Sequence, residues 1–188
     1  MAEIDAAVAD GRIPASLDQV ISDAAARELP YLQACIKEGL RWLPPIAGML
    51  PKKTPPQSDT INGHFVPGGV TVSWCVKGIH HNPALYGPDP QAYRPDRWIH
   101  TSTGGDEPSE EKIATIERNN DLIFGHGKYS CLGKSVAVIE LNKVFVELLR
   151  RFEFSLMKPE EEWRGGGCFG IFLQKGLWVT VRKRELKV

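Results

Sequence analysis

The sequence lacks the features that mark several large classes of protein. Its 188 residues carry 23 Lys plus Arg and 23 Asp plus Glu, so no excess of charge would attract nucleic acid or an acidic membrane surface. No apolar run approaches the roughly 18 residues that a membrane-spanning helix requires. The first residues are acidic where a signal peptide would be basic. We therefore expect no nucleic-acid partner, no membrane segment within this chain and a cytosol-facing location.

Cysteine is scarce, and no two of its residues are close in the sequence. The four lie far apart, at Cys35, Cys75, Cys131 and Cys168. This spacing does not suggest a zinc knuckle or a redox motif, and it does not resemble a secreted disulfide framework, although it leaves a single structural disulfide open. We expect reduced thiols that mostly fill space, so a chemical role for any of them needs evidence from its neighbours.

The first half of the chain predicts short elements of both kinds. Residues 32–43 carry apolar side chains at helical spacing, and Pro44-Pro45 ends that helix. Residues 51–56 predict an irregular connection. Asn62-Gly63 predicts a hairpin turn within residues 61–66, and residues 70–74 are rich in strand formers.

The second half predicts a loop, a long helix and two strands. Residues 101–120 are polar and contain Gly104-Gly105, which predicts an exposed loop. Residues 134–152 place apolar side chains on one helical face. The tail predicts strands at 170–173 and 177–181, joined by a short turn.

A glycine-rich loop leads directly into the long helix and holds a cysteine. Gly125 and Gly127 permit backbone angles closed to other residues, so the loop can fold tightly around Cys131. The start of a helix presents unpaired N–H groups and a positive dipole end, which favour an anion, and the thiolate is the form that binds metals. Gly133 leaves room for a flat macrocycle to approach the backbone. On position alone, a buried and inert thiol is the simpler interpretation.

The residues around the cysteine favour the ligand. Residues 124–133, FGHGKYSCLG, resemble the haem-binding loop of cytochromes P450, F-G-x-G-x-R-x-C-x-G. Two further segments follow the order of that family. Glu38-Gly-Leu-Arg41 resembles the E-x-x-R of the family's K helix, and residues 93–98, YRPDRW, resemble its F-x-P-E-R-F segment. The resemblance covers essentially the whole chain and is greatest to filamentous-fungal members.

The resemblance implies an α+β fold, mainly helical, that forms the C-terminal part of the cytochrome P450 fold. Residues 1–188 would be a single partial domain that runs from the end of the J helix through the K helix, β hairpins, meander, cysteine loop and L helix to a terminal β hairpin. The family's I helix, with its acid–Thr pair, has no counterpart in these residues. We therefore expect a C-terminal piece that is not active alone, and we identify no catalytic residue in it.

The implied cofactor is haem b, iron protoporphyrin IX, with Cys131 as the axial ligand of the iron. Tyr129 stands where the family usually has an Arg or His that contacts a haem propionate, and its hydroxyl can still donate a hydrogen bond. Lys52 falls where many members place a propionate-binding Arg, although a simple exposed lysine is the alternative. The expected haem-binding residues are Phe124, Gly125, Gly127, Tyr129, Cys131, Gly133 and Lys52.

The resemblance also implies a charged cluster of Glu38, Arg41 and Arg97 that steadies the haem-binding core. Periodicity alone gives a different expectation, because Glu38 and Arg41 lie opposite the apolar stripe of their helix. A pair on a solvated face contributes little to stability. In the family, the segment that follows residue 93 covers this face and buries the pair.

The implied function is that of a haem-thiolate monooxygenase, or a C-terminal fragment of one, oxidising a small apolar molecule with O₂ in secondary metabolism. Longer family members are bound to the endoplasmic reticulum membrane. Two alternatives stay open: a non-catalytic haem-binding module and an inactive truncated gene product. NADPH-cytochrome P450 reductase would supply electrons, docking over basic residues near the cysteine such as Lys128, Lys134 and Lys143.

Three further segments invite a functional interpretation. His80 and His81 are adjacent, but the family uses this region structurally, so we expect no metal there. The segments that approach the substrate in the family correspond to residues 46–49 and 169–171.

Overall fold

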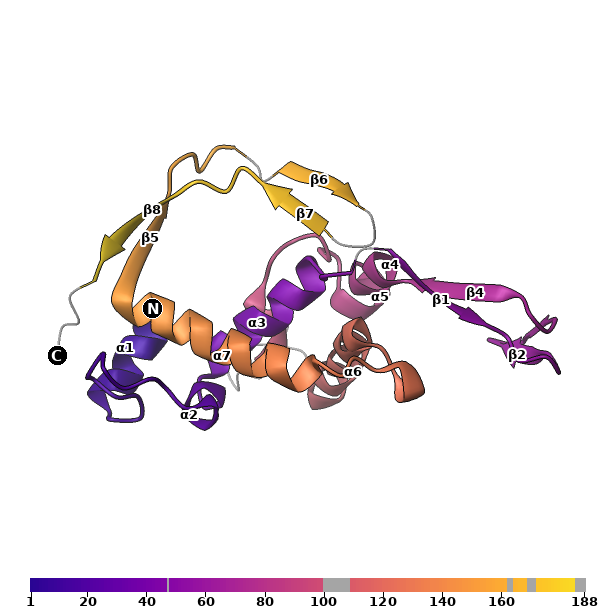
Figure 1. Cartoon of the computed structure of the whole chain (residues 1–188), viewed down its shortest axis with the longest axis horizontal. Helices are drawn as coiled ribbons and strands as arrows, with labels where there is room; N and C mark the ends of the chain where they lie inside the picture. The colour runs from indigo at the N-terminus through magenta and orange to yellow at the C-terminus, as the bar shows by residue number, and fades with distance from the viewer. Residues whose placement is uncertain (47, 100–108, 162–163, 169–171, 185–188) are drawn as a thin grey trace.

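The computed structural model describes residues 1–46, 48–99, 109–161, 164–168 and 172–184. Figure 1 shows helices at the centre of the molecule and two-stranded ribbons around them. One ribbon extends away from the helices on the side where α3 ends. The others run above the helices in that view, towards the C-terminus.

Four helices surround the main hydrophobic core. They are α1 (Ala2–Ala9), α2 (Asp23–Arg27), α3 (Pro30–Trp42) and α7 (Lys134–Arg151). Helix α3 begins at a proline, which suits its first turn, and its first N–H groups are capped from a distant element. The carboxylate of Glu3 in α1 accepts hydrogen bonds from the backbone N–H groups of Tyr31 and Leu32, at 2.7 and 2.9 Å. The buried core consists of Ile4, Ala7, Ile13, Ile21, Ala26, Leu29, Leu32 and Val146.

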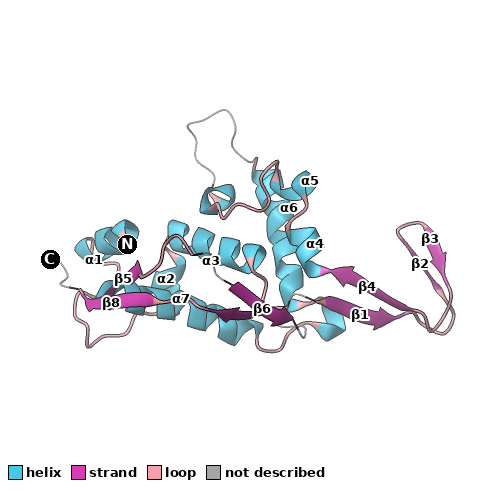
Figure 2. Ribbon diagram, turned by 90° about the horizontal axis from the view of Figure 1, so that it is seen from above, coloured by secondary structure: helices cyan, strands magenta, loops and turns pink. Residues whose placement is uncertain are grey.

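A second group of short helices covers another face of α3. These are α4 (Val76–His80), α5 (Pro83–Tyr86), the 3-10 helix η1 (Pro95–Trp98) and α6 (Glu110–Asp121). Figure 2 shows α4, α5 and α6 gathered on the side of α3 away from α1 and α2. Their buried contacts with α3 are made by Ala34, Tyr86, Trp98 and Ile116. Helix α3 therefore lies between two cores.

The strands form four antiparallel pairs in the described part of the chain. Strand β1 (Met49–Lys53) pairs with β4 (Thr71–Cys75), and β2 (Asp59–Ile61) pairs with β3 (His64–Val66) at the far end of that ribbon. Strand β5 (Phe152–Leu156) pairs with β8 (Val179–Lys183), and β6 (Arg164–Cys168) pairs with β7 (Phe172–Lys175). The mixture of helices and small antiparallel sheets is the α+β class that the sequence predicted.

Several predicted elements are confirmed. The helix predicted at 32–43 is α3, the strand predicted at 70–74 is β4, and the long helix predicted at 134–152 is α7. The hairpin turn is also confirmed: Asn62 and Gly63 both have positive φ, at 50° and 80°. Two positive φ values in succession are what a two-residue hairpin requires.

Two predictions of irregular structure are wrong. Residues 51–53 are not an irregular connection but belong to β1, where Pro51 is tolerated because each strand of this ribbon has only one partner. Much of the loop predicted at 101–120 is helix α6 in its described part. The side chain of Ser109 accepts a hydrogen bond from the N–H of Lys112 at 3.2 Å, and Glu110 and Glu111 stand in the first turn. Both are helix-start signals.

The tail strands predicted at 170–173 and 177–181 do not pair with each other. They correspond to β7 and β8, and each pairs with an earlier strand. The terminal hairpin is formed instead by β6 and β7. Gly176, with a φ of 86°, bends the chain between two separate sheets. Residues 170 and 171, where the first strand was expected to begin, lie outside the described residues.

Candidate functional site

The cysteine loop is a closed turn between two short 3-10 helices and α7. Helix η2 (Leu122–Phe124) enters it, η3 (Gly127–Tyr129) crosses it, and α7 begins three residues after Cys131. The N–H of Cys131 donates to the carbonyl of Phe124 at 2.6 Å, which closes the loop. Gly125 has a φ of 74°, and a Cβ at this position would lie 2.7 Å from the carbonyl oxygen of Tyr129. Only glycine fits there.

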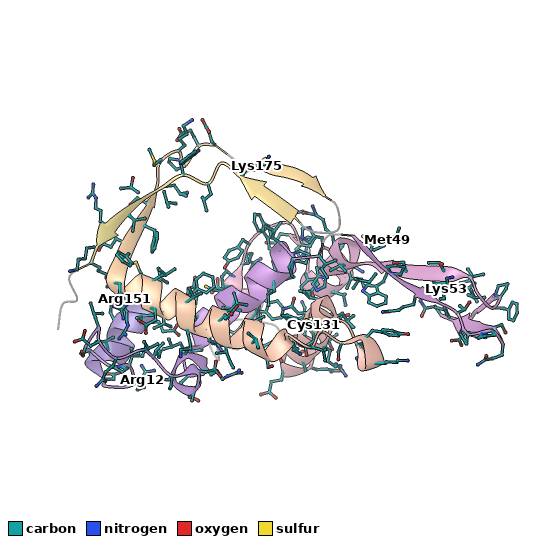
Figure 3. The ribbon with its side chains drawn as sticks, in the orientation of Figure 1. Arg12, Met49, Lys53, Cys131, Arg151 and Lys175 are labelled. Carbon is teal, nitrogen blue, oxygen red and sulfur yellow. The ribbon has the colours of Figure 1, made fainter. Side chains whose placement is uncertain are left out.

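Cys131 stands at the N-terminal end of α7 with its side chain exposed. Figure 3 labels it where the cysteine loop meets the helix. The next residue, Leu132, is 99% exposed, so its side chain does not cover this corner. Gly133 is the helix N-cap, and a Cβ there would be 3.8 Å from the sulfur of Cys131. The thiol is therefore presented outward beside a position without a side chain, which a bulky flat ligand could approach closely.

The two residues expected to contact haem propionates lie side by side. Lys52 comes from β1 and Tyr129 from the cysteine loop, and the ammonium nitrogen of Lys52 lies 3.8 Å from the centroid of the Tyr129 ring. A second ammonium group, that of Lys128, lies 5.8 Å from the same centroid. The contacts bring two positive charges close to the ring that carries the phenolic hydroxyl, and these are suitable partners for a carboxylate.

An open apolar cavity lies between α1, α3 and α7 and reaches the cysteine loop. Its volume is about 1350 Å³. Phe124 forms its wall at the loop, while Ala137 and Leu141 line it from α7, Ile36 lines it from α3 and Leu43 from the residue after that helix. Apolar surface of this kind is costly to expose to water, so it is suited to cover by an apolar group.

Glu38 and Arg41 form a bidentate ion pair in the interior. The Nε and Nη2 of Arg41 donate to the two carboxylate oxygens of Glu38, each at 2.7 Å, and both side chains are fully buried. The remaining Arg41 donors reach main-chain carbonyls of His80 (2.9 Å), Pro90 (2.6 Å) and Ala92 (2.9 Å). The arginine therefore joins α3 to the segment that precedes η1.

The same carboxylate also binds the segment around η1. Arg97 donates to Glu38 through Nε at 3.1 Å, the indole N–H of Trp98 donates at 2.9 Å, and the backbone N–H of Arg94 donates at 2.7 Å. Burial opposes ionisation of Glu38, but the hydrogen bonds from Arg41, Arg94 and Trp98 outweigh it, so the pKa of Glu38 is below its usual range. Glu38 is a carboxylate with all its partners supplied by the fold.

The structure thus brings Glu38, Arg41 and Arg97 together, and the surface pair expected from periodicity is not what forms. Periodicity fails because η1, α4 and α5 cover the polar face of α3. The sequence did not predict that the Trp98 indole and the Arg94 backbone N–H also donate to Glu38. The signal available was the tryptophan itself, since a buried indole N–H needs an acceptor.

His80 and His81 make structural contacts. The Nδ1 of His80 lies 2.8 Å from the carbonyl of Val76, one turn earlier in α4. The ring of His81 bridges the carbonyl of Trp42, at 3.1 Å, and the side chain of Gln91, at 2.7 Å. Within the described ranges, no three His, Cys, Asp or Glu side chains gather in a way that could hold a metal ion.

The three lysines expected to meet a reductase differ in their surroundings. Lys128 is exposed in the cysteine loop, Lys134 forms an ion pair with Asp121 at 2.9 Å, and Lys143 lines the apolar cavity far along α7.

The segments expected near the substrate are only partly described. Residues 46 and 48–49 lead from α3 into β1, with Met49 exposed. Residues 47 and 169–171 lie outside the described residues. None of the described helices is both long and apolar enough to cross a lipid bilayer.

Comparison with known proteins decides the family. Residues 1–170 match the cytochrome P450 family. The chain belongs to the cytochrome P450 family. It is 41% identical over 184 residues to cytochrome P450 monooxygenase ABA1 of Pyricularia oryzae, which covers 98% of this chain and 34% of the relative. Cytochrome P450 monooxygenase aba1 of Botryotinia fuckeliana is 36% identical, with 97% and 34% covered, and cicH of Emericella nidulans is 37% identical, with 86% and 30% covered.

The chain spans about a third of the length of these curated P450 relatives. The match identifies it as a C-terminal P450 segment that resembles fungal monooxygenases of the family. Haem b is the cofactor of this family. The residues present fit that group: the cysteine is exposed, Gly133 leaves space beside the sulfur, and Lys52 and Tyr129 stand together for a propionate.

Proposed function

We propose that Cys131, as a thiolate, is the axial ligand of haem iron, and that this chain forms the haem-binding part of a monooxygenase. The observation that carries the proposal is the closed glycine loop, which presents an exposed sulfur at the start of α7. When bound, a thiolate-ligated haem supplies activation of O₂ for insertion of one oxygen atom into a substrate. The substrate class is a small apolar molecule, and the setting is fungal secondary metabolism.

The chain's own residues would bind and orient the cofactor. The phenol of Tyr129 and the ammonium group of Lys52 would bind a propionate, with one charge-assisted hydrogen bond from the lysine. Gly125, Gly127 and Gly133 would keep the loop close to the macrocycle, and Phe124 would shield the sulfur side from water. The buried Glu38, Arg41 and Arg97 cluster would hold α3 and the η1 segment in place behind the site.

NADPH-cytochrome P450 reductase is the proposed electron donor, and a cytosol-facing position at the endoplasmic reticulum membrane is the proposed location. Lys128 is the best supported contact of the three lysines, because it is exposed and lies in the cysteine loop. Lys134 is already paired with Asp121, and Lys143 lies in the apolar cavity. Association through such charges depends on salt.

The test is a haem titration of the chain, followed by the spectrum of the reduced carbon monoxide complex. The expected result is the red-shifted Soret band of a thiolate-ligated iron, absent in Cys131→Ala and retained in Cys75→Ala. Cys75 is the matched control because its thiol is also exposed. The same substitutions are then made in a chimera that joins this chain to the remaining part of the Pyricularia oryzae relative. A band that persists in Cys131→Ala in both proteins would overturn the assignment.

A further inference from the structure

Helix α7 contains a second Glu-x-x-Arg pair, Glu147-Leu-Leu-Arg150, with the same spacing as Glu38 and Arg41. The Nη2 of Arg150 lies 2.9 Å from one oxygen of Glu147 and 3.0 Å from the other, and its Nε donates at 3.1 Å. The Arg150 side chain is fully buried, and that of Glu147 is 16% exposed. The pair is thus an interior one.

The guanidinium of Arg150 also donates hydrogen bonds to main-chain carbonyls of residues 10–22, which connect α1 and α2. Its Nη1 donates to the carbonyl of Pro14 at 2.7 Å, and its Nη2 makes a short contact with the carbonyl of Gln19. The next residue, Arg151, donates to the carbonyl of Leu17 at 2.6 Å. Carbonyls of an irregular segment have no strand or helix partner, so these arginines satisfy groups that would otherwise be costly to bury.

Glu147 binds the same connection from the acceptor side. It accepts a hydrogen bond from the backbone N–H of Ile21 at 2.8 Å, besides those from Arg150 and Arg151. Burial opposes its ionisation, but the hydrogen bonds from Ile21 and the two arginines outweigh it, so the pKa of Glu147 is lowered. The arrangement repeats that of Glu38 and Arg41, in which the carboxylate takes a main-chain N–H and the arginine takes carbonyls of a distant irregular segment.

Asn142, nearer the start of α7, attaches the helix to its neighbours at a second point. Its side-chain amide donates to Asp23 of α2 at 2.7 Å and accepts from Gln33 of α3 at 3.0 Å. The polar contacts therefore fix both the rotation of α7 and its position along its own axis. Because the cysteine loop continues directly into α7, any shift of the helix moves Cys131 relative to Lys52 on β1.

We infer that Glu147 and Arg150 are positioning residues, a second acid–arginine lock that holds α7, and with it Cys131, in the register that ligation requires. The inference rests on the proposed function, because it concerns the placement of the proposed ligand. A lysine at position 150 would keep the charge but could not supply the planar fork that reaches the carboxylate and the carbonyls together.

The experiment compares Arg150→Lys and Glu147→Gln with Lys158→Gln. Lys158 and Glu161 form a control pair with the same spacing. The Nζ of Lys158 lies 2.6 Å from a carboxylate oxygen of Glu161, and both side chains are exposed. Haem is titrated into each protein well below its unfolding temperature, and the thiolate signature of the reduced carbon monoxide complex is recorded. We expect weaker haem binding and a partial loss of the signature for the two α7 variants, and neither change for Lys158→Gln.

Hydrogen exchange of the Ile21 amide gives a readout that does not depend on haem. Its protection should fall in Glu147→Gln, which weakens the acceptor, and should not change in Lys158→Gln. Unchanged haem affinity and signature in both α7 variants would overturn the positioning role, even if their unfolding temperatures fall. A wild-type chain without the thiolate signature, in which Ile21 still loses protection on substitution of Glu147, would instead contradict the proposed function of Cys131.

Discussion

The ammonium group of Lys52 lies 3.8 Å from the centroid of the Tyr129 ring, so that strand β1 meets the cysteine loop. The contact joins the two residues at which this chain departs from the usual arginine-based propionate site. A lysine over an aromatic face is attracted by the ring quadrupole and is also kept close to the phenolic oxygen. One residue supplies the charge and the other the directed hydroxyl, so together they can replace part of what a single arginine provides.

Removing the charge at Lys52 should weaken haem binding more than removing the hydroxyl at Tyr129. Both side chains would hydrogen-bond to an ionised propionate, and a hydrogen bond to a charged group contributes about 1.5–3 kcal/mol. Only Lys52 also brings a positive charge to the carboxylate. We therefore expect roughly a 10–100-fold loss of haem affinity in Lys52→Met and a smaller loss in Tyr129→Phe, measured by haem titration. The neighbouring exposed Lys53→Met is the control, because alternation along β1 turns its side chain to the other face. Equal losses at positions 52 and 53 would contradict a specific contact.

Breaking the buried pair of Glu38 and Arg41 should destabilise the fold strongly. Removal of one partner leaves an uncompensated buried charge, which costs roughly 3–5 kcal/mol. Arg41→Ala should lower the free energy of unfolding by that amount in urea titrations and should reduce haem incorporation. Arg94→Ala is the control, because its side chain forms an exposed pair with Asp89 at 2.7 Å, and such pairs contribute about 0–1 kcal/mol. Similar losses for the two variants would show that the interior pair behaves as a surface pair.

The cysteine loop itself could be predicted from sequence because its constraints are local. Gly125 at positive φ and the hydrogen bond from Cys131 to Phe124 involve residues only a few positions apart. The long helices α3 and α7 could be predicted for the same reason, since apolar periodicity is read within one segment. The surroundings of Glu38 could not, because η1 lies far along the chain and periodicity cannot show which segment covers a polar face.

Strand pairing also depends on distant segments and could not be predicted from the local sequence. Strands β7 and β8 were located approximately, but their pairing depends on β5 and β6, whose positions were not predicted. For helix α6 the local signals conflict: the polar composition of that stretch predicts a loop, whereas Ser109 and the acidic first turn are helix-start signals. The lock formed by Glu147 and Arg150 was visible only as a spacing, and its partners at Pro14 and Ile21 are tertiary.

A side chain at position 125 should disrupt the loop beyond the cost of its backbone angle alone. Gly125→Ala combines a positive φ with a Cβ only 2.7 Å from the carbonyl oxygen of Tyr129. Gly11 is a matched control, because its φ of 73° is nearly the same and nothing lies within 4 Å of a Cβ there. A left-handed conformation costs a non-glycine residue roughly 1–2 kcal/mol. We expect Gly11→Ala to lose about that much stability in thermal unfolding, and Gly125→Ala to lose more and to bind haem weakly. Equal losses of stability in the two variants would mean that the loop can accommodate the Cβ at position 125 without a further energetic cost.

His80 should make the stability of the fold depend on pH just below neutrality. Burial lowers the pKa of His80 from its ordinary value of 6.5, and the nearby charge of Arg41 lowers it further, against the opposing hydrogen bond to Val76. Well above pH 6.5 the group is neutral in both states. As the pH falls through that value the unfolded chain takes up a proton more readily than the folded chain, so stability falls with the pH, by at most about 1.4 kcal/mol per pH unit.

Carboxylates do not obscure this window. The pKa values of Asp23, Glu38 and Glu147 are lowered from ordinary values of 3.8 to 4.5, so the stability that these groups contribute is lost only at more acidic pH. Urea unfolding of the wild type at pH 7.5 and 5.5 should therefore show a drop in the free energy of unfolding. His80→Gln should show a smaller drop between the same two pH values, whatever its stability at pH 7.5. The exposed His64→Gln should keep the wild-type difference, and an undiminished drop in His80→Gln would mean that His80 takes up its proton as readily in the folded chain as in the unfolded one.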